Sequence, residues 1–106
     1  VFEAAEENEE RRVLVIGSNA NQNDLRPKVI AASAVIDVAK TFVSVARDVH
    51  DGRFKGGIFT EDLKSGNIYL AISDAFKSQI PAEVMAKIEK AEAALKDGSL
   101  SLSASA

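Results

Sequence analysis

The sequence contains no cysteine, no tryptophan and a single histidine, His50, among its 106 residues. Without cysteine the chain can form no disulfide, no thiolate metal site and no cysteine nucleophile, and one histidine cannot supply a multi-histidine metal site. The 13 basic residues are outnumbered by 16 acidic ones, which gives a net charge of −3, and no segment concentrates lysine or arginine. We therefore expect no metal, no cofactor and no nucleic-acid partner, because phosphate binding usually requires a basic patch.

Long apolar runs are also missing, since none approaches the roughly 18 residues that span a bilayer. The length is that of about one domain. The chain begins at Val1 rather than at a methionine. We therefore expect it to be part of a longer protein.

The first 24 residues have the order helix, strand and polar loop, which is typical of α/β proteins. Residues 1–11 are rich in good helix formers, and we expect their glutamates to form a solvated helix face rather than a metal site. Residues 13–16 are a short aliphatic run ended by Gly17, which is typical of a strand buried on both faces. The polar loop follows the carboxyl end of this strand, where α/β proteins bind ligands.

A second strand and a longer helix are predicted in the middle of the chain. Residues 29–36 are mostly apolar, with small residues at 31–34 that allow either tight packing against a helix or close approach of a ligand. Asp37 is a suitable N-cap for a helix over 37–50. The larger side chains of this helix form one apolar stripe, made of Val38, Phe42, Val45, Ala46 and Val49.

The C-terminal half predicts a β-hairpin and a last helix. Residues 56–63 and 67–72 resemble two strands that flank a turn at 64–66. Pro81 favours the start of a helix over 81–96, and we expect residues 101–106 to be a flexible tail. Together these patterns predict an α/β fold. The strands at 13–16 and 29–36 would lie side by side in a mostly parallel sheet, with the helices at 1–11 and 81–96 packed on it.

Four segments of the chain resemble the basic membrane protein family, the substrate-binding lipoproteins of ABC transporters that include purine-nucleoside receptors. The segments are VFEAAEE, VIGSNANQNDLRP, SAVIDVAKTFVSVARDVHDGRFKGGIFTEDLKSG and IPAEVMAKIEKAEAALKDGSL. The most specific features are a Gly-x-[Asp/Asn]-x-[Asp/Asn]-Gln loop after a strand and a helix that ends in DGRFKGG. The resemblance covers nearly the whole chain and the C-terminal part of the family's proteins.

The resemblance implies the C-terminal portion of a type I periplasmic-binding-protein fold, with residues 1–100 as a piece of a two-lobed protein. In such folds the ligand lies between two α/β lobes joined by crossing strands. The helix at 37–50 would then belong to the lobe opposite the strand at 13–16. The expected partners are a small-molecule solute, the remainder of the same protein and an ABC permease, with a homo-oligomer as a further possibility.

The resemblance also implies a ligand site. Nucleoside-binding members have an aspartate at the position of Asn19, and an asparagine there can still accept from and donate to a sugar hydroxyl. They have a lysine at the position of Ile36, and Asp37 could supply an acceptor instead, although it could be engaged as the N-cap. Asn21 and Gln22 match the second polar pair of the loop and would either shape it or contact the ligand.

These residues predict a solute-binding component of an ABC importer, for a nucleoside or similar sugar-bearing molecule. The expected location is extracytoplasmic, either lipid-anchored or periplasmic. One alternative is a non-transport sensor or assembly module with an altered cleft. Another is that the loop asparagines only satisfy turn geometry, because asparagine tolerates left-handed conformations. We do not expect an enzyme, since Asp24, Asp37 and His50 show no catalytic spacing.

Overall fold

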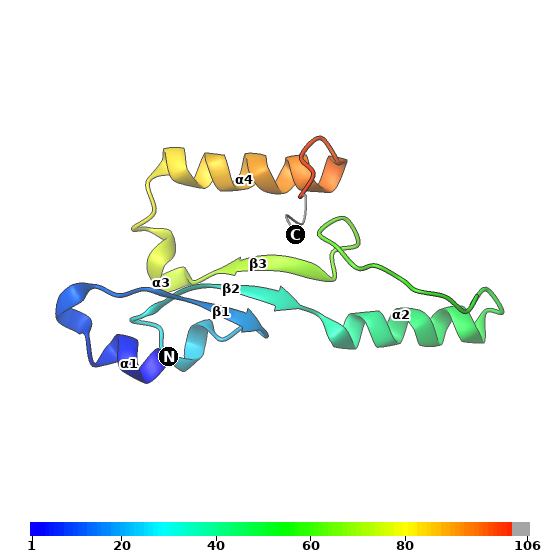
Figure 1. Ribbon diagram of the computed structural model, residues 1–106, viewed down its shortest axis with the longest axis horizontal. Coiled ribbons are helices and arrows are strands. Elements are labelled where there is room, and N and C mark those ends of the chain that lie inside the picture. Colours follow the sequence, from blue (N-terminus) through cyan, green and yellow to red (C-terminus); the bar gives the residue numbers. More distant parts are fainter. Residues whose placement is uncertain (103–106) are drawn as a thin grey trace.

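The computed structural model describes residues 1–102 as a small three-stranded sheet with helices at its sides and ends (Figure 1). The flexible tail predicted over 101–106 lies mostly on residues 103–106, which are outside the described residues. In chain order the elements are α1 (Phe2–Glu6), η1 (Glu9–Arg11), β1 (Val15–Asn19), η2 (Asn23–Leu25), β2 (Ile30–Ile36), α2 (Val38–His50), β3 (Ile68–Ile72), α3 (Asp74–Lys77) and α4 (Ala82–Asp97).

The sheet has the strand order β1-β2-β3, with β1 parallel and β3 antiparallel to β2. The predicted pairing of the first two strands is therefore confirmed. The first strand is predicted over 13–16, but β1 starts at Val15 and ends at Asn19. Its last three residues, Gly17 to Asn19, pair with Ser33 to Val35, so the ladder continues three residues beyond the predicted end.

The core lies at the amino end of the parallel pair. Ala5 of α1 packs against Val29 and Ile30, and Phe2 and Val15 contact the same cluster. The predicted helix over 1–11 is interrupted after α1, and η1 follows as a separate turn.

The first strand is not buried on both faces, as its apolar run predicted. It is an edge strand in the described sheet, and Ile16 is 67% exposed. Continuous apolar runs are typical of strands with layers on both sides, and in the described chain a layer covers this strand on one side only.

The predicted hairpin is wrong. Residues 67–72 include β3, but β3 pairs with β2 across Ala32–Ile72 and Ile36–Ile68 rather than with residues 56–63. The latter segment forms neither helix nor strand, and Ile58 is 99% exposed. β3 pairs through one edge with β2, and residues 56–63 do not pair with its other edge in the described chain.

The two long helices stand away from the sheet. As predicted, Asp37 caps α2, with Oδ1 accepting from the backbone N–H of Lys40 at 2.9 Å. Figure 1 shows α2 running on past the end of β2 and α4 lying apart from the sheet, and neither helix has a buried residue. The prediction that the helix at 81–96 packs on the sheet is therefore wrong.

The overall shape is elongated. The radius of gyration is 17.2 Å, whereas a compact domain of this length has about 13 Å. None of the helices in the described part of the chain is long and apolar enough to cross a membrane.

Candidate binding site at the carboxyl edge of the sheet

The predicted site residues meet at one edge of the sheet. Asn19, the last residue of β1, is in register with Val35, and Ile36 and Asp37 follow directly. Because β1 and β2 are parallel, their carboxyl ends open onto the same edge. The structure thus brings together Asn19, Ile36 and Asp37, which are separated by 17 to 18 positions in the sequence.

Asn19 has an unusual backbone and an uncommitted side chain. Its φ is +75°, a left-handed conformation that asparagine tolerates better than most residues. Its side chain is exposed, and the amide forms no hydrogen bond with any residue between 1 and 102. Turn geometry therefore accounts for the positive φ of Asn19. It does not engage the side-chain amide, which remains available to a ligand.

The loop after β1 is held by a buried polar network. The backbone N–H of Gln22 donates to Ser33 Oγ at 3.1 Å, and this hydroxyl donates to Asn23 Oδ1 at 2.8 Å. Asn23 Nδ2 donates to the carbonyl of Ala71 in β3 at 3.1 Å. Ser33 is 0% exposed and Asn23 is 7% exposed. The network ties the loop to β2 and β3 next to Asn19 at the end of β1.

Asn21 and Gln22 shape this loop. Asn21 Oδ1 accepts from the backbone N–H of Asn23 at 3.1 Å, which is an Asx turn. Gln22 Oε1 lies 3.3 Å from the backbone N–H of Ser18, from which it accepts. Both side chains thus hydrogen-bond within the loop, and the prediction that they contact the ligand stays a prediction.

Gly17 permits the close approach of the loop to the sheet. A Cβ at this position would lie 2.7 Å from Ser33 Oγ and 2.8 Å from Gln22 Oε1, closer than van der Waals contact allows. The sequence reasoning missed Ser33 and Asn23 as site-building residues. The available signal was a hydroxyl in an otherwise apolar strand, since a buried polar group requires a partner.

Ile36 and Asp37 form the second half of the edge. Ile36 is 44% exposed, so it offers an apolar contact. Asp37 is half-buried, and its carboxylate is engaged in part as the N-cap. The Asp37 backbone N–H donates to the carbonyl of Asn67 at 2.7 Å, which joins the start of α2 to the start of β3.

No three potential metal-ligating side chains cluster anywhere within residues 1–102. His50 lies at the far end of α2, where its Nδ1 is 3.0 Å from Asp51 Oδ1. The edge therefore offers an amide, a partly engaged carboxylate and an apolar side chain, which suit hydrogen bonding to a neutral polar ligand.

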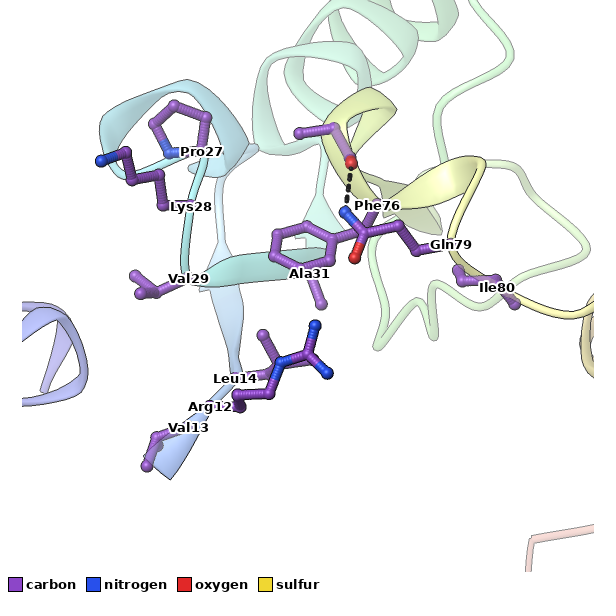
Figure 2. Close-up of a pocket in the computed structure, with 11 residues that line it drawn as sticks. Arg12, Val13, Leu14, Pro27, Lys28, Val29, Ala31, Phe76, Gln79 and Ile80 are labelled. Atoms are coloured by element: carbon purple, nitrogen blue, oxygen red, sulfur yellow. Dashed lines mark hydrogen bonds between the residues drawn. The ribbon is translucent and has the colours of Figure 1, made fainter. Parts of the chain in front are cut away.

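A separate cavity lies at the opposite end of the parallel pair. It has a volume of about 740 Å³ and opens at the amino ends of β1 and β2. Figure 2 shows that the residues around it come from the segment before β1, the turn before β2 and α3. In open α/β sheets ligands bind at the carboxyl ends of strands, so this cavity is not the predicted site.

Comparisons with known proteins support the fold. No family model and no curated protein matches the chain. One similar solved structure is an ABC transporter solute-binding protein from Aeropyrum pernix K1, with 22% identity, a TM-score of 0.77 and coverage of 96% of this chain and 36% of that one. Another is a transcriptional activator of the comK gene from Bacillus halodurans, with 26% identity, a TM-score of 0.72 and coverage of 88% and 32%.

The chain thus spans about a third of the length of either structure. The likeness confirms the predicted fold class, a mixed α/β part of a solute-binding-protein fold with a mostly parallel sheet flanked by helices.

Proposed function

We propose that the chain is part of the solute-binding component of an ABC importer and belongs to the basic membrane protein family. The observation that carries the proposal is the uncommitted amide of Asn19, held at the carboxyl edge of the sheet beside Ile36 and Asp37. The fold likeness to an ABC transporter solute-binding protein supports it.

The proposed ligand is a nucleoside or another neutral, sugar-bearing molecule. An amide can both donate to and accept from a hydroxyl, and the Asp37 carboxylate accepts but would repel an anion. Phosphate groups are usually bound by glycine-rich turns at a helix N-terminus or by cations. The loop from Ser18 to Asn23 contains neither a glycine nor a basic residue.

The proposal includes partners and a location. Part of the site would come from the remainder of a two-lobed protein, since the similar structures are about three times as long as this chain. The assembled protein would work outside the cytoplasm, lipid-anchored or periplasmic, and deliver its solute to an ABC permease. It would bind its ligand without catalysis.

A sensor or assembly module remains the second candidate. Ile36 places an apolar side chain where the nucleoside receptors have a lysine, and the Bacillus halodurans structure is that of a transcriptional activator. A thermal-shift screen against nucleosides and sugars separates the two, because a ligand that binds the folded state raises Tm. Stabilisation by one ligand class supports import, and no response across the screen supports the second candidate.

The site itself is tested by titration calorimetry of the complete two-lobed protein with the nucleoside that stabilises it. Asn19→Ala should weaken binding by about 1–3 kcal/mol, the cost of losing a buried hydrogen-bond partner. Lys64→Ala should leave the affinity unchanged, because Lys64 is exposed in the turn before β3. Equal affinities for the two variants would contradict the site.

Asn19→Gly separates the amide from the backbone, because glycine adopts a positive φ without strain. If the amide binds the ligand, the glycine and alanine variants lose similar affinity. If only the alanine variant loses affinity, backbone strain is the cause and the amide is not a ligand contact.

A further inference from the structure

Three hydrogen bonds join the first turn of α2 to the turn that precedes β3. The backbone N–H of Asp37 donates to the Asn67 carbonyl at 2.7 Å, and Asn67 Nδ2 donates to Thr41 Oγ1 at 3.1 Å. Lys40 Nζ donates to the Gly66 carbonyl at 3.1 Å. We call these three bonds the α2 clamp.

The clamp acts on a helix that has little else to hold it. No residue of α2 is buried, and the helix extends away from the sheet (Figure 1). The chain enters α2 through Asp37, which has φ −82° and ψ 77°, and returns to β3 through Gly66, at φ +71°. Neither residue is in a helical or strand conformation, so regular structure does not fix the direction of α2 at either crossing.

Asn67 is the central residue of the clamp and is itself incompletely satisfied. It is 6% exposed, and its Oδ1 has no hydrogen-bond partner among residues 1–102. A buried amide oxygen without a partner is disfavoured, and such groups are uncommon in folded proteins. Its other polar groups are engaged: the backbone N–H donates to Ser65 Oγ at 3.3 Å, the backbone carbonyl accepts from Asp37, and Nδ2 donates to Thr41. Of these contacts, only the one from Nδ2 requires the asparagine side chain.

We propose that Asn67 is a positioning residue that sets the direction of α2 and, with it, the placement of the Asp37 carboxylate at the carboxyl edge of the sheet. The part that concerns ligand affinity rests on the proposed function, whereas the part that concerns the direction of α2 does not. Asn67 acts through Thr41 and Asp37 and does not itself contact the ligand.

The absence of cysteine from the sequence allows a direct test. Spin labels are attached to the full chain at Ser44→Cys in α2 and Ser78→Cys after α3, two exposed positions. The distance distribution between the labels is then measured after dilution with an excess of unlabelled chain, which removes intermolecular distances. Asn67→Ala and Thr41→Val should each shift or broaden this distribution.

The matched control is Asn8→Ala. Asn8 also donates a side-chain hydrogen bond to a carbonyl, that of Ala4 at 2.7 Å, but it lies in the N-terminal segment. This variant should leave the distribution unchanged. If Asn67→Ala fails to fold, Lys40→Met removes the Gly66 contact from the helix surface and should produce the same kind of change.

A double variant, Asn67→Ala with Thr41→Val, tests whether the two residues act together. Both changes remove the bond between Asn67 Nδ2 and Thr41 Oγ1, and Thr41→Val also removes the bond from this hydroxyl to the Asp37 carbonyl. The proposal therefore expects the double variant to shift the distribution no further than Thr41→Val alone. Unchanged distributions in folded variants, or fully additive shifts, would overturn it.

Titration of the same variants with the nucleoside identified in the screen completes the test. A lower affinity that accompanies the label shift supports the role at Asp37, and a lower affinity without any shift would overturn it, because Asn67 would then contact the ligand. If the labels shift but no nucleoside or sugar binds even the unsubstituted protein, the proposed function fails and the control of α2 direction stands.

Discussion

The loop after β1 and the helix after β2 both follow a parallel strand, but they are stabilised in opposite ways. The loop is tied into the sheet by Gln22, Ser33 and Asn23, and two of these three side chains are buried. The helix carries an apolar stripe of which no residue is buried within residues 1–102, and Phe42 is 71% exposed. Polar groups that satisfy each other specify a structure locally, whereas an apolar stripe specifies one only together with a second surface.

The free energy that burial of this apolar stripe would contribute is large compared with the free energy of unfolding of a small protein. Val38, Phe42 and Val49 are 53%, 71% and 58% exposed. Complete burial of such side chains is worth about 1.5–3 kcal/mol each, and a whole domain is stable by only about 5–15 kcal/mol. A surface of this kind is typical of an interaction site.

The largest expected effect is therefore self-association of the isolated chain. At micromolar concentration we expect the 106 residues to sediment as a dimer or higher oligomer rather than as a stable monomer. Phe42→Glu should raise the dissociation constant by about 10- to 100-fold, since it replaces one buried aromatic contact. Sedimentation velocity over a concentration series measures this.

Ser44→Glu is the matched control, because Ser44 is exposed on the same helix outside the apolar stripe. It should leave the association unchanged. A compact monomer that melts cooperatively would contradict the prediction, and would show that residues 1–100 are a self-sufficient domain.

The second prediction concerns the buried network. Ser33→Ala removes the hydroxyl that accepts from Gln22 and donates to Asn23. The buried Asn23 Oδ1 and the part-buried Gln22 N–H then lose this partner, so the free energy of unfolding should fall by about 1–3 kcal/mol. Urea denaturation measures this loss, with Ser44→Ala as the exposed control, which should stay within about 0.5 kcal/mol of the parent.

Equal stability of the two serine variants would show that the loop does not depend on the network. The loop would then be held by its turn residues alone. In that case buried hydrogen bonds would not distinguish the stabilisation of the loop from that of α2.

Local signals were sufficient to predict much of the fold. The N-cap at Asp37, the parallel pairing of the first two strands and the helix that begins near Pro81 follow from short sequence patterns, and the structure confirms them. The carboxyl-edge placement of Asn19, Ile36 and Asp37 follows from that parallel pairing.

The errors concern what each element packs against. The run at 13–16 predicts burial on two faces, and the stripe at 81–96 predicts contact with the sheet. An apolar pattern indicates that an element packs against another surface, but it does not indicate which surface that is. The same limit explains the hairpin, in which residues 56–63 have a strand-like pattern while β3 pairs with β2. Ser33 was missed because its role depends on a loop that folds back from 10 residues earlier in the chain.

The smallest expected effect is at the end of α4, where a local polar contact works without a buried surface. Gly98 ends the helix at φ +81°, and the backbone N–H of Ser99 donates to Asp97 Oδ1 at 2.8 Å. Hydrogen bonding from the Ser99 side chain, and then from its backbone, lowers the pKa of Asp97 below its ordinary value of 3.8. Because the folded pKa is lowered, the contact is fully present above pH 3.8 and is lost as the pH falls through the lower folded value.

The amide resonance of Ser99 should therefore titrate with a midpoint below 3.8, and Asp97→Asn should abolish that titration. A midpoint at or above the ordinary value would mean that the contact does not form in solution, and that even the exposed ends of this chain need a partner to become ordered.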